Sequence, residues 1–254
     1  MAKTNNIDMC GSVYKTPKIS ENKDRASFIL ITTRGNRDAG TNERKIHWDS
    51  IVVLSKDPEV IQAISQINDK DIVRIKGVIV TKNVPKKTYC PQCGKENIVD
   101  GVLVYVEPIY VEKITAADDG DVARQMVYDR REVSNQVRII GDLCCDPSFI
   151  KGFSPKVCQY QIAIPRTYRL KGSSDDDKTD FPWVKSYGKN AVEDMKRLRT
   201  GSLVLIDGCL QARKQIKTQK CENCQKEYQY NDSTLEVVPY ETEYLKNYKT
   251  DEEN

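Results

Sequence analysis

One stretch of the sequence occurs twice, and it limits the possible folds more than any other feature. Residues 72–77 read IVRIKG and residues 203–208 read LVLIDG. Thirteen residues after each glycine a Cys-x-x-Cys pair begins, and fifteen residues after each second cysteine stands a proline; the pairs are Cys90/Cys93 and Cys221/Cys224. A constant offset of 131 superposes residues 72–112 on 203–243 without a gap. The chain therefore contains two copies of one module.

The length and composition of the chain are those of a globular protein large enough for two such modules. The chain has 254 residues, enough for two domains that each bury a core. No apolar run approaches the ~18 residues needed to span a membrane, and the polar N-terminus lacks the apolar segment of a signal peptide. We therefore expect no membrane association and a cytoplasmic location. The net charge of +3 is too small to indicate nucleic-acid binding by itself.

Each module reads as β-strands with one short helix. In the first, strands are predicted at residues 7–11, 26–33, 46–54, 72–77 and 101–107, and a helix capped by Asp57 at residues 58–67. In the second, residues 135–141, 159–166 and 181–187 read as strands and residues 191–198 as a helix capped by Asn190. Five strands with a helix between the third and fourth predict an all-β protein made of two tandem oligonucleotide/oligosaccharide-binding (OB) barrels with zinc-knuckle hairpins.

The module boundaries follow from composition. We expect one OB domain at residues 1–116 and a second at residues 135–246. A polar, charged linker is expected at 117–134 and a disordered acidic tail at 247–254.

Four segments of the second module resemble bacterial and phage-type single-stranded-DNA-binding proteins. They are NQVRIIGDL (135–143) with the following Asp-Pro, IAIPR (162–166), DFPWVKSYGKNAVE (180–193) and GSLVLIDGCLQAR (201–213). The resemblance implies non-enzymatic, largely sequence-independent binding and protection of single-stranded DNA in replication or recombination. Members of that family present four barrels, which implies a homodimer here, and a phage or mobile element is a possible source.

Two features depart from that family. Its members end in an acidic peptide with an apolar tip that docks replication proteins, whereas residues 251–254 read DEEN. A replication-protein partner thus remains only possible. Ordinary members also lack cysteine pairs in the fourth-to-fifth-strand hairpin, so these pairs need their own explanation.

The third strand of the second module carries the main candidates for base stacking. Phe181, Trp183, Lys185 and Tyr187 are spaced by two and so share one face of the sheet. We favour this face as a stacking surface, because as a core it would bury the lysine. In the alternative, the aromatic side chains form the core, and Val184 and Ser186 face solvent.

Other binding candidates come from both modules. Trp48 stands in the corresponding strand of the first module and aligns with Trp183, and stacking by Trp48 is as plausible as burial. Candidate phosphate contacts, each of which could equally be a solvated surface charge, are Arg34, Arg166, Arg169, Arg213, Lys214, Lys82, Lys86 and Lys87.

The two cysteine pairs predict a structural zinc site. Zinc prefers four tetrahedral ligands, and each hairpin supplies only two. Cys90, Cys93, Cys221 and Cys224 could share one zinc within the chain, the knuckles could pair between chains, or each pair could be a turn without metal. We favour one shared site, closed within the chain because this needs no oligomer.

The sequence favours a binding protein over an enzyme. It contains one histidine, no phosphate-binding loop and no recognisable nucleophile–histidine pair. The alternative function is an OB-fold adaptor or RNA-binding module that recruits replication proteins through its zinc knuckles.

Overall fold

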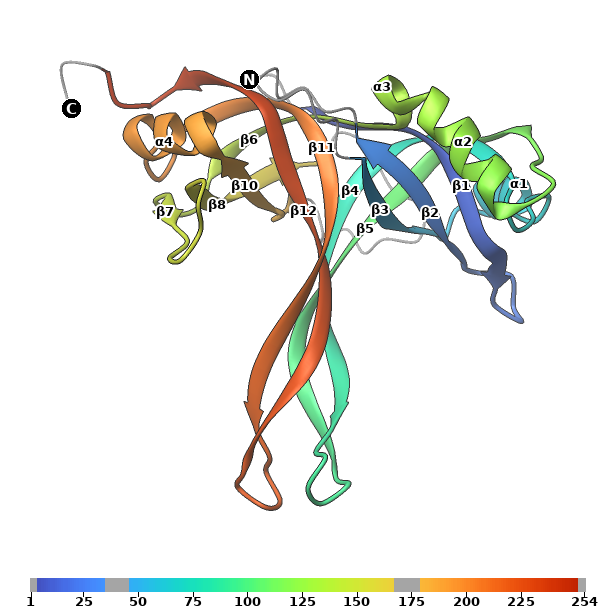
Figure 1. The fold of residues 1–254 in the computed structure, drawn as a ribbon, viewed down its shortest axis with the longest axis horizontal. Coiled ribbons are helices and arrows are strands. Elements are labelled where there is room, and N and C mark those ends of the chain that lie inside the picture. The colour runs from blue at the N-terminus through green and yellow to red at the C-terminus, as the bar shows by residue number, and fades with distance from the viewer. Residues whose placement is uncertain (1–3, 35–45, 167–178, 251–254) are drawn as a thin grey trace.

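The computed structural model describes residues 4–34, 46–166 and 179–250. Two β-barrels lie side by side, and two long hairpins project together from between them (Figure 1). None of the helices in these residues is long and apolar enough to cross a membrane.

The first barrel closes through five strands in the order β1-β2-β3-β5-β4, with β4 returning to β1. One helix, α1 (Pro58–Ile64), lies between β3 and β4, and the side chain of Asp57 accepts a hydrogen bond from the Glu59 N–H at its start, as predicted. The strands are β1 (Thr4–Ile19), β2 (Ala26–Arg34), β3 (His47–Ser55), β4 (Ile72–Tyr89) and β5 (Glu96–Thr115).

The second barrel repeats this order with β6, β8, β10, β12 and β11, and β11 returns to β6. The two OB barrels and their all-β class were thus predicted correctly. The strands are β6 (Asn135–Leu143), β7 (Ser148–Phe149), β8 (Val157–Pro165), β9 (Thr179–Asp180), β10 (Trp183–Tyr187), β11 (Leu203–Lys220) and β12 (Glu227–Lys246).

The helix of the second barrel differs in its start from the prediction. Helix α4 (Gly188–Arg197) begins at Gly188, three residues earlier than expected. Asn190 lies inside the helix, and its side-chain amide donates to the Tyr240 carbonyl at 3.0 Å instead of capping the helix.

The segment between the barrels is helical, although its polar composition predicts a linker. It forms α2 (Gly120–Asp129) and α3 (Arg131–Ser134), and Asp119 caps the first of these. Ala123 and Val127, four residues apart and therefore on one helix face, bury against Cys10 and Ile72 of the first barrel. Met126 and Ala117 pack against the same cluster, so a small apolar face docks a helix that its polar composition does not predict.

The barrels join through their first strands. Strand β1 pairs antiparallel with β6, with Ile7 opposite Val137, so all twelve strands belong to one continuous sheet. The barrel interiors also form one apolar cluster that contains residues of both repeats. The two copies of the module are therefore fixed relative to each other by backbone hydrogen bonds and by core packing.

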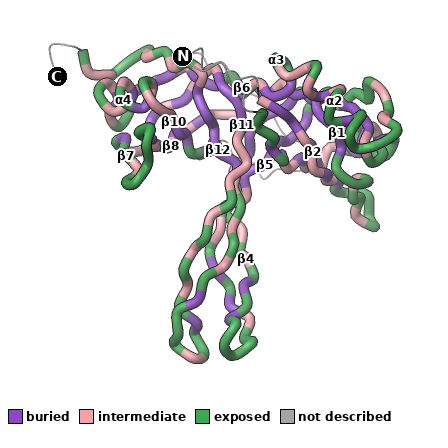
Figure 2. The backbone as a smooth tube through the Cα atoms, in the orientation of Figure 1, coloured by how far each residue is buried: buried purple, intermediate pink, exposed green. Residues whose placement is uncertain are grey.

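The projecting hairpins are extensions of β4–β5 and β11–β12 beyond the barrels, wound around each other (Figure 1). We call the four extended segments the stem. Most stem residues are exposed or half-buried, with buried positions near the tips (Figure 2). At the base of each hairpin stands the glycine that ends the repeated sequence. A Cβ at Gly77 would lie 2.4 Å from the Glu107 carbonyl oxygen, and one at Gly208 would lie 2.3 Å from that of Val238, so only glycine fits.

The start of the predicted disordered tail packs on the second barrel. The Lys249 N–H donates to the Arg197 carbonyl at 2.7 Å, and the Asn247 carbonyl accepts from Arg199 and from Ser202. Residues 251–254 lie outside the described part of the chain.

Candidate metal centre and nucleic-acid interface

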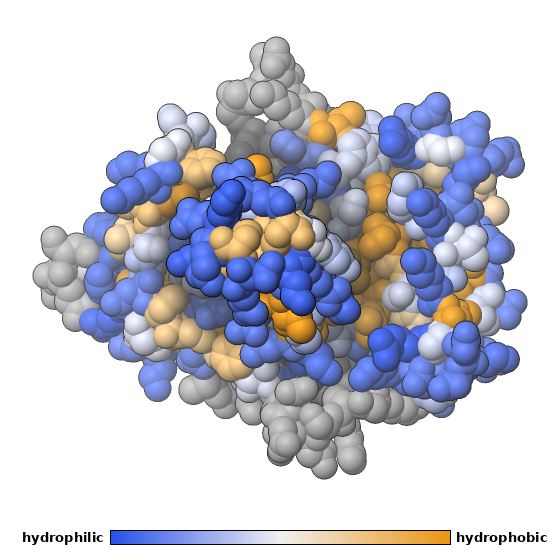
Figure 3. Space-filling model, turned by 90° about the horizontal axis from the view of Figure 1, so that it is seen from below, coloured by the Kyte–Doolittle hydropathy of each residue, from blue (hydrophilic) through white to orange (hydrophobic). Residues whose placement is uncertain are grey.

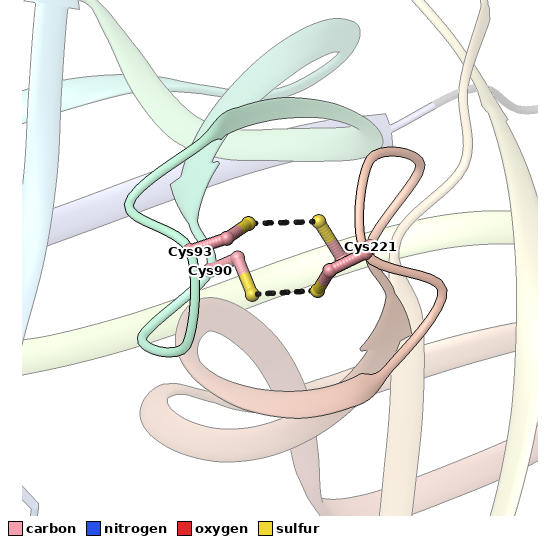
Figure 4. A group of neighbouring side chains, drawn as sticks. Cys90, Cys93 and Cys221 are labelled. Atoms are coloured by element: carbon pink, nitrogen blue, oxygen red, sulfur yellow. Dashed lines mark hydrogen bonds between the residues drawn. The ribbon is translucent and has the colours of Figure 1, made fainter.

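The two hairpin tips bring all four predicted cysteine ligands together. The sulfur atoms of Cys90, Cys93, Cys221 and Cys224 lie within 4.8 Å of one another. Across the tips, Cys90 Sγ lies 3.7 Å from Cys224 Sγ, and Cys93 Sγ lies 3.7 Å from Cys221 Sγ (Figure 4). The duplicated pairs therefore form one four-sulfur cluster within a single chain, which could hold a metal ion.

The same backbone turn aims the sulfurs in both tips. The Cys90 N–H donates to the Lys95 carbonyl at 3.0 Å, and the Cys221 N–H donates to the Lys226 carbonyl at 2.9 Å. Each turn requires one residue with positive φ, which is Gly94 (69°) in the first tip and Gln225 (60°) at the matching position of the second. The second tip thus adopts the same turn without glycine.

Asn97 of the first hairpin connects the two tips. Its Oδ1 accepts from the Glu222 N–H at 3.1 Å, and its Nδ2 lies 3.7 Å from Cys221 Sγ. Backbone N–H groups, first that of Cys224, together with this amide lower the pKa of the Cys221 thiol to about 6. The pKa of Cys93 is lowered as well, mainly by the Lys95 N–H. At Cys93 and Cys221 this environment favours the thiolate, the form of cysteine that binds metals. The hydrogen bond from the Lys226 N–H lowers the pKa of Cys224, but burial and the neighbouring thiols outweigh it and raise this pKa to about 11.

The stem below the tips is held by ion pairs that engage some of its lysines and leave others exposed. Lys86 and Lys217, from different hairpins, both contact the Asp232 carboxylate, at 2.5 and 2.6 Å. Lys87 pairs with Glu96 at 2.9 Å on the surface. Of the predicted phosphate contacts in the stem, Lys82 and Lys214 are exposed and form no ion pair with any described residue.

Strand β10 presents aromatic side chains outward but buries its lysine. Phe181, just before β10, is 44% exposed and Trp183 is 41% exposed, whereas Val184 and Ser186 point into the barrel. The alternative in which the aromatic side chains form the core is therefore wrong for Phe181 and Trp183. Tyr187 is half-buried, its hydroxyl donates to Gln211 at 3.4 Å, and burial raises its pKa.

The Lys185 ammonium group contacts Glu236 at 2.7 Å, and both side chains are buried. This contradicts the expectation of a free lysine beside the aromatic side chains. The partner, Glu236, lies 51 residues away, and no local pattern indicates it.

Arg34, at the end of β2, and Arg166, just after β8, also form ion pairs. Arg34 contacts Asp49 at 2.7 Å and Arg166 contacts Asp180 at 2.6 Å. Phosphate contact by either arginine would therefore require its ion pair to open, and this contact stays a prediction.

Each aspartate also reaches the opposite hairpin, and sequence reasoning missed this role. Asp49 accepts from the Ala212 N–H, and Asp180 accepts from the Thr81 N–H, at 2.9 and 2.7 Å. The donating positions, 81 and 212, differ by the repeat offset of 131, and so do the accepting aspartates. We call each arginine–aspartate pair with its cross-repeat bond a brace.

Trp48 does not occupy the place of Trp183. In the first barrel Val53 pairs with Val106, and in the second Val184 pairs with Val237. Because positions 106 and 237 differ by the repeat offset of 131, Val53 and Val184 are equivalent. The counterpart of Trp183 is therefore Val52, while Trp48 lies opposite Thr33 near the start of β3 and is 39% exposed. The prediction that Trp48 aligns with Trp183 is wrong.

Trp183 borders a groove of about 700 Å³ between the stem and the second barrel. One wall is the stem of the first repeat, through residues 83–85 and 100–102, and the floor includes Gln159, Lys185 and Glu236. Arg213 lies 3.6 Å from Glu236 and 5.7 Å from the ring of Phe153. Arg169 lies outside the described residues. Seen from the stem side, apolar surface gathers beside the stem on the side of the first barrel (Figure 3).

The comparisons with known proteins point to one family. Residues 134–236 match the model of the single-strand binding protein family. A single-stranded DNA-binding protein of Aquifex aeolicus (strain VF5) is 34% identical over 88 residues, which are 34% of this chain and 59% of that protein. The chain thus spans less than two thirds of the length of this relative.

Solved structures show the same fold over the whole chain. The crystal structure of the wild-type single-stranded DNA binding protein from Thermus aquaticus superposes with a TM-score of 0.60 and 14% identity, over 97% of this chain and 95% of that one. A deletion mutant of that protein superposes with the same TM-score and 15% identity, over 99% of this chain and 100% of that one. At this identity the likeness shows the tandem-barrel fold alone.

Proposed function

We propose that this chain, an OB-fold protein of the single-strand binding type, binds and protects single-stranded DNA without acting as an enzyme. The observation that carries the proposal is the exposure of Trp183 beside a groove, with exposed Phe181 two residues before it, in the repeat whose sequence matches the family model. Base stacking on such side chains tolerates any sequence because every base has an aromatic face. The exposed Lys82 and Lys214 supply charge for the phosphates.

Binding to labelled oligo(dT) tests the function directly. We expect affinity well above that for a duplex of equal length, and a decrease with added salt as condensed counterions are released. Affinity for duplex equal to that for oligo(dT), or binding independent of salt, would contradict the proposal. A parallel titration with oligo(U) tells DNA from RNA binding.

We further propose a homodimer with a role in replication or recombination. The supporting argument is the family resemblance, in which four barrels act together, since each chain supplies two. Light scattering on a size-exclusion column should give twice the chain mass of 29.0 kDa. A single-chain mass at micromolar concentration would rule out the dimer without affecting the DNA-binding proposal.

The four cysteine sulfurs fit a structural zinc ion. Tetrahedral zinc with Zn–S bonds of about 2.3 Å separates its sulfurs by about 3.8 Å, and two of the sulfur pairs lie 3.7 Å apart. Four thiolates leave no open coordination position, so the metal would hold the tips together and perform no chemistry. A cytoplasmic location, which we also propose, keeps such thiols reduced.

Elemental analysis tests the zinc site. We expect about one zinc per chain, and its loss in both Cys90→Ser and Cys221→Ser because each tip provides half of the ligands. Cys144→Ser is the matched control, since Cys144 is exposed and lies outside the cluster. Full zinc in either tip variant would contradict a shared four-cysteine site.

A further inference from the structure

The groove beside Trp183 is built by both repeats. Trp183, Gln159 and Lys185 belong to the second barrel, whereas Val84, Pro85 and Val102 belong to the stem of the first repeat. Neither repeat alone would enclose it. A volume of about 700 Å³ falls within the range of small-molecule sites.

The charges of the groove disfavour a phosphate. Its lining includes three carboxylates, Asp100, Asp232 and Glu236, and two ammonium groups, Lys185 and Lys217. Both lysines are already paired, Lys185 with Glu236 and Lys217 with Asp232. Lys86 also contacts Asp232, and Arg213 lies 3.6 Å from Glu236. These four cations already face carboxylates, so a phosphate entering the groove would have to displace an ion pair to find a partner.

The remaining lining suits an uncharged aromatic ring. Trp183 offers a stacking face, and Val84, Pro85 and Val102 offer an apolar wall opposite the barrel. Neutral side chains that can bond to base edges also line the groove: Asn83, Gln159, Gln215 and Thr234.

The width of the groove is set before any ligand arrives. The Lys86–Asp232 contact joins the two hairpins at the level of the groove, and the cysteine cluster joins them again at the tips. The Thr81 N–H bond to Asp180 fixes the first hairpin to the second barrel at the base. A site held in advance loses less entropy on binding.

We infer that this groove is a base-binding subsite, in which a base of the bound strand stacks on Trp183 while the first repeat's stem covers it. The strand then passes between the stem and the second barrel, with its phosphates outside the groove. The inference rests on the proposed binding of single-stranded DNA. It adds the position of one bound base and the requirement that both repeats form the site that holds it.

A charge placed on the far wall tests this. Val102→Glu adds bulk and a negative charge at an exposed position that lines the groove, so the fold should be unaffected. We expect oligo(dT) affinity to fall about tenfold, because a stacked base is worth ~1–3 kcal/mol. The matched control is Ile98→Glu, on the same strand and exposed but outside the groove, with an expected loss of less than about twofold because it changes only the net charge.

The outcomes separate this inference from the proposed function. Equal losses in the two variants would overturn the subsite, and so would an unaffected Val102→Glu when Trp183→Ala weakens binding; both results would leave DNA binding intact. Absence of oligo(dT) binding in the wild-type chain would overturn both. Zinc content and thermal unfolding of each variant confirm that the stem is formed.

Discussion

The outer faces of the two barrels occupy equivalent places beside the stem but differ in chemistry. On the first barrel the face is an apolar cluster that includes Val52, Leu54 and Tyr105. The equivalent positions on the second barrel are Trp183, Lys185 and Glu236, an exposed aromatic side chain over a buried ion pair. One backbone plan thus carries an apolar surface on one copy and a polar, aromatic groove on the other.

This difference shows which parts of the module have to match and which can differ. The barrel strands, the braces and the cysteine turns occur in both copies because the joint sheet and the stem need them from both sides. The side chains on the outer faces of the barrels are not needed by the joint sheet or the stem, so these residues can differ between the two copies. The family model matches residues 134–236, which lie in the second repeat, and this is also the repeat that exposes Phe181 and Trp183.

The largest expected effect comes from breaking a brace. Asp180→Ala removes the carboxylate that the Arg166 guanidinium contacts and frees the Thr81 N–H. We expect the free energy of unfolding, measured in urea, to fall by about 3–5 kcal/mol. Asp49→Ala should lower the free energy of unfolding by less, because the Arg34 side chain is 15% exposed and the Arg166 side chain only 7%.

The control for the braces removes both charges at once. Arg166→Met combined with Asp180→Leu should recover much of the stability, since no unpaired charge stays buried. If either single variant unfolds like the wild type, the braces do not join the barrels to the stem.

The next largest effect separates the two tryptophans. Trp183→Phe leaves Trp48 as the only tryptophan, and Trp48→Phe leaves only Trp183. We expect oligo(dT) to quench the fluorescence of the Trp183-only variant strongly and that of the Trp48-only variant weakly. Trp183→Ala should weaken binding by ~1–3 kcal/mol, the value of one stacked base. Strong quenching of Trp48 alone would place DNA on the first barrel as well.

Local patterns were enough to predict the barrels, both cysteine turns and the capping of α1 by Asp57. They depend on strand alternation and on spacing within one repeat. The partners of Lys185, Arg34 and Arg166 could not be predicted, because burial converts an apparent surface cation into an ion pair and only the fold brings the carboxylate near. Trp48 was misplaced for a simpler reason: Arg34 precedes Trp48 by fourteen residues, but Arg166 precedes Trp183 by seventeen.

The two barrel helices differ in a way that pH should reveal. Helix α1 buries only aliphatic side chains, whereas α4 buries Asp194, which accepts from the hydroxyls of Tyr160 and Tyr244 at 3.2 and 2.8 Å. Burial raises the pKa of Asp194 above its ordinary value of 3.8. The native state therefore holds that proton more tightly than the unfolded state does. The stability that this tighter proton binding contributes is fully present below pH 3.8, the ordinary pKa of the group. It is lost as the pH rises through the raised pKa of the native state.

Asp194→Asn removes this titration and keeps one oxygen, which can accept from one of the two tyrosine hydroxyls. We expect the wild-type chain to gain stability relative to this variant as the pH is lowered from 7 towards 4, measured by urea unfolding at each pH. A constant difference between the two proteins across that range would mean that Asp194 does not titrate there.

The smallest expected effect concerns one pair of equivalent basic residues. Lys82 and Arg213 differ by the offset of 131, yet Lys82 is exposed while Arg213 lies 3.6 Å from Glu236. A free cation that contacts a phosphate releases counterions, with a slope of about −0.7 per contact for single strands. Lys82→Ala should therefore reduce the slope of log K against log salt by about 0.7, and Arg213→Ala by less because Arg213 is already neutralised. Lys23→Ala, in an exposed turn, serves as the control and should leave the slope unchanged. A larger change for Arg213 than for Lys82 would mean that the strand displaces Glu236 from Arg213 on binding, so that the groove is rearranged by its ligand instead of being formed in advance.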